Sequence, residues 1–381
     1  MDAHTTLALR SLVTADGHLE LSLASEAVPA PGTGDVLIRV EAAPINPSDI
    51  GLLLGPADMG GIRSVPGEHG SRVIAPIPAA AMASQAARVG IPMAVGNEGA
   101  GIVVAAGSSP EAQRLLGRTV AVMGGGMYSQ YRCVRAADCL VLPEGTTPAQ
   151  GASCFVNPLT ALGFVETLRD EGHGAIVQIA AASNLGQMLL RICLKDGIPL
   201  VNIVRSAAQA QLLRAQGARH VCDSTSPVFR EELTEAIATT GATLAFDPTG
   251  GGPLGGQVLS CMESALRRRP GEKFSRYGSK TFKQLYVYGG LDPRPLELPR
   301  DIGMAWGAGG WLLFHFLEKA PAETVRSLKA RVADELTSTF ASHYTRSVSL
   351  SEALQPEVIE AFSRRSTGEK FLLEPWKDLV R

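Results

Sequence analysis

The chain has 381 residues, of which 45% are hydrophobic and 19% are charged. This composition is typical of a globular protein of two or three domains and excludes a disordered chain. The formal net charge of −2 excludes the strong basic character of a dedicated nucleic-acid-binding protein. Aromatic residues make up 5% of the chain, too few for an array of base-stacking side chains or an aromatic membrane belt.

The first 20 residues lack a basic segment followed by an unbroken apolar run, so no signal peptide is expected. No apolar run reaches the roughly 18 residues of a membrane-spanning helix. The six cysteines contain no C-x-x-C pair, which favours reduced thiols over a disulfide framework. These features predict a cytoplasmic protein that does not associate with a membrane.

The first 150 residues have the pattern of short strands separated by turns. Apolar runs bounded by glycine or other turn residues occupy 35–45, 99–107 and 118–126. Many short strands with little helix predict a barrel-like β domain. The Ala- and Pro-rich stretch at 75–90, within a longer unusual segment at 57–95, is expected to be a surface insertion.

From Pro158 onward, apolar strands alternate with helical segments in units of about 30 residues, as in βαβ crossovers. This alternation predicts a doubly wound parallel sheet. The expected strands are 175–181, 199–205, 219–224, 242–251 and 283–291, and the expected helices are 186–197, 207–217 and 229–241.

The end of the chain is expected to be helical from Trp311 toward Leu336, with a final strand at FLLEP. The apolar segment Trp306 to Glu318 is interpreted as a core helix or a dimer contact. The basic run 267–269 is interpreted as the solvated last turn of a helix, where cations complement the dipole.

The turn from Ala180 to Gly186 joins a parallel strand to a helix. Free backbone N–H groups at such a helix start suit a pyrophosphate. Arg205 ends the next strand, and no Asp or Glu occurs between residues 197 and 222. An arginine at that position favours a 2′-phosphate, so NADPH is predicted over NADH. The turn has one glycine of the three in G-x-G-x-x-G, and an ordinary turn with a solvated Arg205 is the alternative.

Five ordered motifs surround this region: VLIRVEAAPINPSDI, GNEGAGIVVAAG, GMYSQY, FVNPLTALGF and TGEKFLLEP. In this order the chain resembles the medium-chain dehydrogenase/reductase superfamily, in its branch of zinc-free quinone oxidoreductases and enoyl thioester reductases. The resemblance implies a GroES-like catalytic domain at 1–156 and a Rossmann NADPH-binding domain at 157–312. The segment 313–381 would return to the catalytic domain, and a homodimer acting on a small molecule is expected.

The resemblance also implies that zinc is absent. Asn46, Asn97 and Asn157 stand where zinc-dependent relatives have metal ligands, and an amide oxygen is a poor substitute for thiolate or imidazole. The cysteine spacing does not fit the four-cysteine structural zinc lobe of those relatives.

For catalysis, the resemblance places Asn46 and Asp49 at the floor of the active site. The Asn46 amide would donate to a substrate oxygen while Asp49 fixes the local backbone. The alternative is a plain turn in which Asp49 or Ser48 caps the next helix. Relatives that reduce enoyl thioesters carry a tyrosine shortly after this motif, where this chain has GLLLGPADMGG. Tyr128 and Tyr131 are interpreted as packing residues.

The resemblance implies a set of cofactor-binding residues. Near the nicotinamide it places Asn157, Thr160, Tyr288, Gly289 and Gly290; at the pyrophosphate Ser183, Asn184, Leu185 and Gly186; at the 2′-phosphate Arg205 and Ser206; and near the adenine ribose Thr249 and Gly250.

Two further positions complete this set. Gln209 occupies the place of a lysine that family members often have at the phosphate. Lys370 either reaches the cofactor from the C-terminal segment or is a solvated lysine in a turn.

The resulting hypothesis is a zinc-independent, NADPH-dependent oxidoreductase that transfers hydride to a quinone or another conjugated carbonyl. Orientation of donor and acceptor would supply most of the catalysis. Two alternatives stay open: an enoyl thioester reductase acting on 2-enoyl-CoA or acyl carrier protein substrates, and an NADPH-binding redox sensor with little catalysis.

Overall fold

The computed structural model describes residues 5–269, 271, 274–366 and 368–379. The chain divides into two compact units: unit 1 comprises 1–156 with 329–381, and unit 2 comprises 157–328. The first division coincides with the predicted boundary at 156/157. The second lies after the predicted 312/313, because Trp311 and Phe316 stack on each other and Trp311 packs against Phe164 of unit 2.

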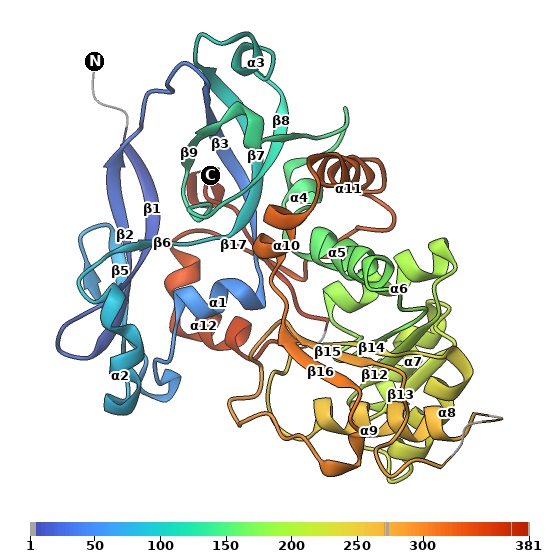
Figure 1. Cartoon of the computed structure of the whole chain (residues 1–381). Coiled ribbons are helices and arrows are strands. Elements are labelled where there is room, and N and C mark those ends of the chain that lie inside the picture. The colour runs from blue at the N-terminus through green and yellow to red at the C-terminus, as the bar shows by residue number, and fades with distance from the viewer. Residues whose placement is uncertain (1–4, 270, 272–273, 367, 380–381) are drawn as a thin grey trace. The chain divides into compact units, whose positions relative to one another are not determined.

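Unit 1 is a β domain built from two sheets, in which all strand pairs are antiparallel except β17 with β18 (Figure 1). One sheet has the strand order β4-β5-β2-β1-β6, and the other has the order β10-β8-β7-β3-β18-β17 with β9 paired to β3. The strands are β1 Thr5–Val13, β2 His18–Ala27, β3 Asp35–Ile45, β4 Arg63–Gly67, β5 Gly70–Pro76, β6 Met93–Ala94, β7 Glu98–Ala106, β8 Thr119–Met123, β9 Tyr131–Arg135, β10 Leu140–Val141, β17 Arg346–Val348 and β18 Phe371–Leu373.

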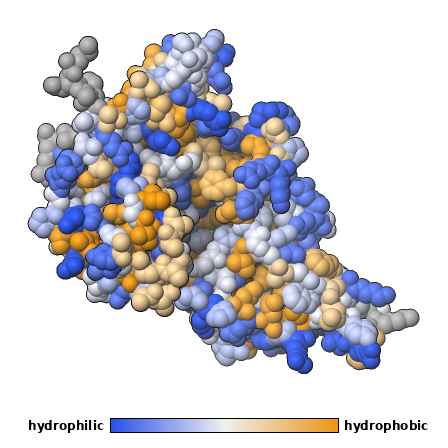
Figure 2. All heavy atoms as spheres, turned by 60° about the vertical axis from the view of Figure 1, so that its left-hand side comes forward, coloured by the Kyte–Doolittle hydropathy of each residue, from blue (hydrophilic) through white to orange (hydrophobic). Residues whose placement is uncertain are grey.

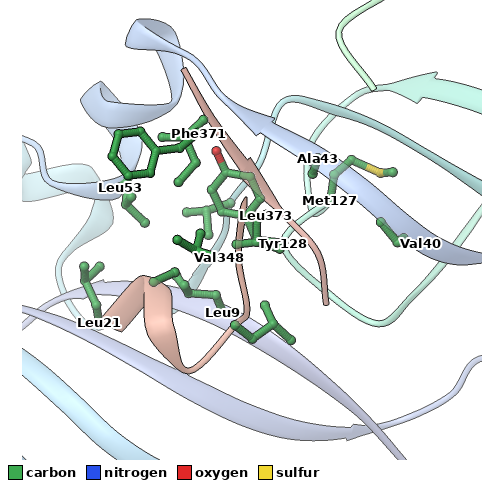
Figure 3. Packing of buried hydrophobic residues seen from close by; sticks show 14 of the residues in the cluster. Leu9, Leu21, Val40, Ala43, Leu53, Met127, Tyr128, Val348, Phe371 and Leu373 are labelled. Carbon is green, nitrogen blue, oxygen red and sulfur yellow. The ribbon is translucent and has the colours of Figure 1, made fainter. Parts of the chain in front are cut away.

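The core of unit 1 joins residues from both ends of the chain. Strand β18 pairs antiparallel with β3, so that Phe371 lies opposite Ile45. Figure 3 shows Phe371 and Leu373 of this strand in one apolar cluster with Leu9 and Tyr128. Burial of these side chains, at about 25 cal/mol per Å² of apolar area, holds the C-terminal strand in the N-terminal β domain.

Unit 2 contains a six-stranded parallel sheet with the order β13-β12-β11-β14-β15-β16. Counted along the chain this is 3-2-1-4-5-6, the order of the doubly wound dinucleotide-binding fold. The strands are β11 Ile176–Gln178, β12 Leu200–Val204, β13 His220–Asp223, β14 Leu244–Asp247, β15 Lys283–Val287 and β16 Trp306–Gly310. The predicted α/β fold with a second, GroES-like β domain is confirmed.

Helices cover both faces of the parallel sheet: α5 and α6 lie on one side in Figure 1, and α8 and α9 on the other. The continuous apolar strands predicted this arrangement, because both faces of each strand are buried. The helices of the chain are α1 Pro47–Leu53, α2 Ala79–Gln85, α3 Pro110–Gln113, α4 Pro148–Gly151, α5 Val156–Asp170, α6 Asn184–Asp196, α7 Ala207–Ala215, α8 Phe229–Thr240, α9 Leu254–Arg267, α10 Leu313–Lys319, α11 Ala322–Asp334 and α12 Pro356–Ser363.

Two local expectations need correction. Residues 306–310 form the edge strand β16 and not the first part of a helix, because backbone pairing with β15 satisfies a segment of glycines that has poor helix propensity. The helical stretch after Trp311 is divided at Pro321 into α10 and α11. The segment 75–90, expected as a surface insertion, contains α2 and a short 3-10 helix at Ala86–Arg88.

The basic run 267–269 closes helix α9, as predicted, with all three arginines exposed. Among the described residues, none of the helices has the length and apolar character needed to cross a membrane. Figure 2 shows hydrophilic and hydrophobic residues interspersed over the visible face.

Candidate functional site

In unit 1, the NPSD motif forms the junction between strand β3 and helix α1. Asn46 is the N-cap of α1, with an extended backbone at φ −93° and ψ 158°. The Asp49 side chain turns back: Oδ2 accepts from the Asn46 N–H at 2.9 Å and Oδ1 accepts from the Asn97 N–H at 2.7 Å. Asp49 therefore fixes two backbone segments at the helix start, the geometry of the helix-capping alternative.

A second buried carboxylate, Glu98, holds the Asn46 side chain. Its Oε1 accepts from Asn46 Nδ2 at 2.7 Å, and its Oε2 accepts from the backbone N–H groups of Phe155 and Val156, each at 2.9 Å. Glu98 has no exposed surface. Hydrogen bonds to Glu98, at the start of β7, therefore join the end of β3 to the start of α5.

Lys370 joins this arrangement from the C-terminal segment. The β3–β18 register pairs Phe371 with Ile45, so the next positions in register are Lys370 and Asn46. Only 8% of Lys370 is exposed. Its Nζ lies 3.5 Å from Ser342 Oγ and 5.4 Å from the centre of the Tyr344 ring. Lys370 is therefore not the solvated lysine that the turn sequence allowed.

Burial shifts the pKa values of the three ionisable side chains in this cluster. Desolvation raises the pKa of Asp49 to about 7, against the opposing effect of its two backbone hydrogen bonds. It lowers the pKa of Lys370 to about 8, while the charges of Glu98 and Asp49 act in the opposite direction. Desolvation likewise raises the pKa of Glu98, and Lys370 counteracts that shift. Such perturbation by burial and a nearby charge is typical of functional sites.

Glu98 was not among the residues singled out from the sequence. One signal was available: it is the single acid in the apolar segment GNEGAGIVVAAG. An acid in such a run must find hydrogen-bond donors once it is buried. Tyr128 is buried in the apolar core and donates its hydroxyl to the Pro44 carbonyl at 2.9 Å. The same side chain also interacts with Asp49, so Tyr128 borders this cluster as well.

In unit 2, the predicted cofactor residues gather at the carboxyl edge of the parallel sheet. They follow β11, β12, β14 and β15, the strands on both sides of the point where the strand order reverses. Open α/β sheets bind ligands at that point. Asn157 and Thr160 lie apart from this edge in sequence, in the first turns of α5, and are 8% and 6% exposed.

The turn between β11 and α6 is compact. Ser183 is the N-cap of α6, and its side chain accepts from the Gly186 N–H at 3.1 Å. A Cβ at Gly186 would lie 2.3 Å from the Ala181 carbonyl oxygen, so only glycine allows this close approach of helix and strand. Ala180 takes the left-handed conformation, at φ 55°, that a glycine would adopt without strain.

Arg205 follows β12 and is exposed. Its backbone N–H donates to Gln209 Oε1 at 3.0 Å, and Ser206 caps helix α7 by accepting from the Gln209 N–H at 3.3 Å. Gln209 thus stabilises the turn between β12 and α7 through these two hydrogen bonds. The guanidinium of Arg205 is the cationic group of this turn that a phosphate could meet.

The turns after β14 and β15 lie against each other. Thr249 donates both its backbone N–H and its hydroxyl to Asp247 Oδ1, at 2.7 and 2.5 Å. A Cβ at Gly250 would lie 2.3 Å from the Gly289 carbonyl oxygen, which shows how closely the two turns approach. Tyr288 packs edge-to-face on Phe164, with ring centres 4.9 Å apart.

Gly290 completes the second turn and is exposed. A Cβ added there would meet no atom within 4 Å, so the backbone at this position borders open space.

The three positions that carry metal ligands in zinc-dependent relatives are asparagines here. Asn46 Nδ2 donates to Glu98, and Asn97 Nδ2 donates to Ser48 Oγ at 3.2 Å. No group of three or more histidine, cysteine or acidic side chains with metal-binding geometry occurs within 5–269, 271, 274–366 and 368–379.

Comparison with known proteins agrees with this architecture. Residues 32–144 match the family described as alcohol dehydrogenase GroES-like domain. A solved structure from Mesorhizobium loti, provisionally named an NADPH:quinone reductase, superposes on 98% of the chain and 99% of its own length, with a TM-score of 0.72 and 24% identity. Residues 32–144 are thus similar to this family of domains, and the whole chain has the fold of the superposed structure.

Two curated proteins with different names are similar to part of the chain. The synaptic vesicle membrane protein VAT-1 homolog of Rattus norvegicus is 28% identical over 226 residues, 58% of this chain and 48% of that protein. The mitochondrial enoyl-[acyl-carrier-protein] reductase of Xenopus tropicalis is 32% identical over 229 residues, 57% of each chain. The matched part of the chain spans about half the length of these relatives.

Proposed function

We propose that this protein is a zinc-independent, NADPH-dependent oxidoreductase that transfers hydride to a quinone or another conjugated carbonyl. The observation that carries the proposal is the carboxyl edge of the 3-2-1-4-5-6 sheet, where the start of α6, Arg205 and the two glycine turns follow neighbouring strands. Such an edge suits a dinucleotide.

The residues at this edge fit NADPH. The first turn of α6 presents backbone N–H groups suited to a pyrophosphate. Arg205 would bind a 2′-phosphate, with Ser206 beside it. The exposed backbone at Gly289 and Gly290 would leave room for the nicotinamide, near Asn157 and Thr160. A bound dihydronicotinamide supplies a hydride.

Zinc independence follows from the ligand chemistry of the site. Asn46, Asn97 and Asn157 offer amides in place of thiolate, imidazole or carboxylate. Without a Lewis acid, acceptors that delocalise the added electron pair are favoured. The Asn46 amide, held by Glu98, would donate its second hydrogen to the acceptor oxygen, and Asp49 would keep the Asn46 backbone in place.

The decisive experiment measures NADPH oxidation by its loss of absorbance, with 9,10-phenanthrenequinone as acceptor and EDTA present throughout. We expect turnover that EDTA does not reduce and that is faster with NADPH than with NADH. Complete inhibition by EDTA would contradict the zinc-free assignment. Tight NADPH binding without turnover of any acceptor would favour the redox sensor instead.

Replacing Arg205 with alanine tests the 2′-phosphate site. Loss of a charge-assisted hydrogen bond, worth about 1.5–3 kcal/mol, should lower the ratio of kcat/KM for NADPH over NADH by about 10- to 100-fold. The exposed Arg219→Ala in the same unit is the matched control and should leave the ratio unchanged. An unchanged ratio in Arg205→Ala would show that the 2′-phosphate lies elsewhere.

An enoyl thioester reductase is the second candidate, favoured by the 32% identity with the Xenopus tropicalis enzyme. The resemblance implies that such enzymes have a tyrosine shortly after the NPSD motif as proton donor. This chain has no tyrosine between Asn46 and Tyr128, which argues against this candidate. If the protein reduces 2-enoyl-CoA faster than it reduces 9,10-phenanthrenequinone, the enoyl thioester reductase is the better assignment.

A further inference from the structure

The segment after helix α9, residues 267–282, exposes aromatic side chains that a folded protein ordinarily buries. Phe274 is 86% exposed, more than any other large hydrophobic side chain among the residues that the structure describes. Tyr277 and Phe282 are 57% and 52% exposed, and Met304, on a neighbouring loop, is 74% exposed. A group of exposed apolar side chains with polar surroundings marks an interaction surface.

Close backbone contacts bring the loop of Met304 beside this segment. A Cβ at Gly278 would lie 2.8 Å from the Cα of Gly303, and the Lys283 N–H donates to the Ala305 carbonyl at 3.0 Å. The two segments therefore run side by side. We call the described residues of 267–282, together with Met304, the basic aromatic patch.

The charge of this patch is strongly positive. Between residues 264 and 282 the sequence has six basic residues and one acid. The structure describes five of the six, all of them exposed: Arg267, Arg268, Arg269, Arg276 and Lys280. None of these five pairs with a carboxylate within the described part of the chain, so their charges are available to a partner.

A turn presents one cation and one aromatic ring together. The Gly278 N–H donates to the Ser275 carbonyl at 3.2 Å, which closes a turn with Arg276 and Tyr277 at its centre. The Arg276 guanidinium lies 4.5 Å from the centre of the Tyr277 ring. This cation–π contact keeps the charged and the aromatic group next to each other.

A buried ion pair holds the base of the segment in place. Glu263 in α9 accepts from the Ser279 N–H and hydroxyl, each at 2.8 Å, and from Lys283 Nζ at 2.7 Å. The Glu263 and Lys283 side chains are 2% and 0% exposed. Taking two charges out of water is costly. The exposed rings and cations therefore extend from a fixed base rather than from a loose connection.

Charge and side-chain type favour a lipid surface as the partner. Lysine and arginine attract anionic headgroups, and aromatic rings are stable at the level of the headgroups. A single-stranded nucleic acid would stack its bases on aromatic rings, a contact to which Met304 adds nothing. A second copy of the chain would bring the same basic patch against itself, and like charges in contact are unfavourable.

We propose that the basic aromatic patch docks on the surface of an anionic phospholipid bilayer. Docking of this kind places cations at the headgroups and apolar side chains just below them, and it needs no membrane-spanning helix. The lack of a spanning segment in the sequence therefore does not exclude it. The inference goes beyond the proposed hydride transfer and does not depend on it.

The first test is co-sedimentation of the full-length protein with phosphatidylcholine vesicles, alone or with about one lipid in three replaced by phosphatidylserine. We expect binding to the anionic vesicles and little binding to the neutral ones. Raising the salt from about 0.1 M to about 1 M should release the protein, because the Debye length falls from about 10 Å to about 3 Å.

Two variants separate charge from apolar contact. Combining Arg276→Gln with Lys280→Gln should lower the affinity for anionic vesicles about 25-fold, at about fivefold per charge. Phe274→Ser should lower it about tenfold. Arg219→Gln and Ile91→Ser, at exposed positions elsewhere on the chain, are the matched controls and should bind as the wild type does.

A second measurement reports whether the aromatic side chain enters the bilayer. Phe274→Trp adds a fluorophore at the patch, and lipids brominated on the acyl chain quench a tryptophan that reaches the hydrocarbon. We expect more quenching in Phe274→Trp than in the wild type. Ile91→Trp, which adds a fluorophore outside the patch, should show no such increase.

Three results would overturn the inference. These are equal binding of the wild type and Phe274→Ser to anionic vesicles, tighter binding to a single-stranded oligonucleotide than to the vesicles, and self-association in light scattering that Phe274→Ser abolishes. Failure of the proposed hydride transfer looks different. Quinone turnover is then absent while vesicle binding is unchanged, because the patch contains none of the residues proposed to hold the cofactor or the acceptor.

Discussion

Three ionisable side chains are buried together in unit 1: Asp49, Glu98 and Lys370, which are 1%, 0% and 8% exposed. Each carboxylate is held by hydrogen bonds to backbone N–H groups, at 2.7 to 2.9 Å. The carboxylates of Asp49 and Glu98 therefore hold the backbone and the side chain of Asn46 in place. Removing one member would leave an uncompensated buried charge, which is costly.

Asp49 should make the stability of the protein depend on pH. Its pKa is about 7 in the folded protein and 3.8 for an unperturbed carboxyl, so the folded state binds the proton more tightly. The stabilising contribution is present below the unfolded pKa and is lost as the pH rises through 7. The free-energy advantage of the wild type over Asp49→Asn should fall by about 2 kcal/mol between pH 5 and pH 8.

Urea unfolding at the two pH values measures this difference. Asp292→Asn is the control, because Arg294 lowers the pKa of that carboxyl to about 2, below the tested range. Its effect on stability should be the same at pH 5 and pH 8. A constant effect of Asp49→Asn would contradict the raised pKa.

At the scale of elements, the turn from β11 to α6 combines a strained alanine with a required glycine. Ala180 has φ 55°, and Gly186 packs against the Ala181 carbonyl with no room for a side chain. The turn has one glycine of the three in G-x-G-x-x-G, yet it still joins the strand to the helix in a compact conformation. Packing of α6 on the sheet offsets the local strain.

Ala180→Gly should therefore stabilise the protein, by about 1 kcal/mol, because glycine adopts the left-handed conformation without steric cost. Chemical denaturation of the two proteins side by side measures the change. Ala181→Gly, at a buried neighbour with negative φ, should destabilise instead. If both substitutions destabilise to the same extent, the conformation of Ala180 carries no strain.

At the scale of the whole molecule, two units are formed by one chain that leaves unit 1 after residue 156 and returns at residue 329. The proposed cofactor edge belongs to unit 2, while Asn46, Asp49 and Lys370 belong to unit 1. Trp306 and Trp311 lie in unit 2 and Trp376 lies in unit 1, so tryptophan fluorescence can follow unit 2 separately.

In Trp376→Phe, the remaining fluorescence reports the unfolding of unit 2. NADPH at 100 times its Kd should stabilise this unit by about 2.7 kcal/mol, because it binds only the folded state. NADH at the same concentration should stabilise it less. Equal shifts with both nucleotides would contradict a selective 2′-phosphate site, whether or not the protein turns over an acceptor.

The sequence by itself determined much of the fold. Apolar strand runs alternating with helices predicted the doubly wound sheet, and the predicted β3 bounds, 35–45, agree with the structure. These features depend on local periodicity and turn chemistry. The strand at 306–310 was missed because its glycines pair only in the context of β15.

The tertiary structure alone decided which distant residues share a site. Phe371 and Ile45 are separated by more than three hundred residues but pair with each other in the β3–β18 register, directly beside Lys370 and Asn46 in the sequence. Glu98 became a candidate only when its partners, Asn46 and the backbone before α5, were seen beside it. Hydrogen bonds and the electrostatic effects that shift pKa values act over a few ångströms in space. The sequence contains the residues that take part, but it does not show which of them are neighbours in the folded protein.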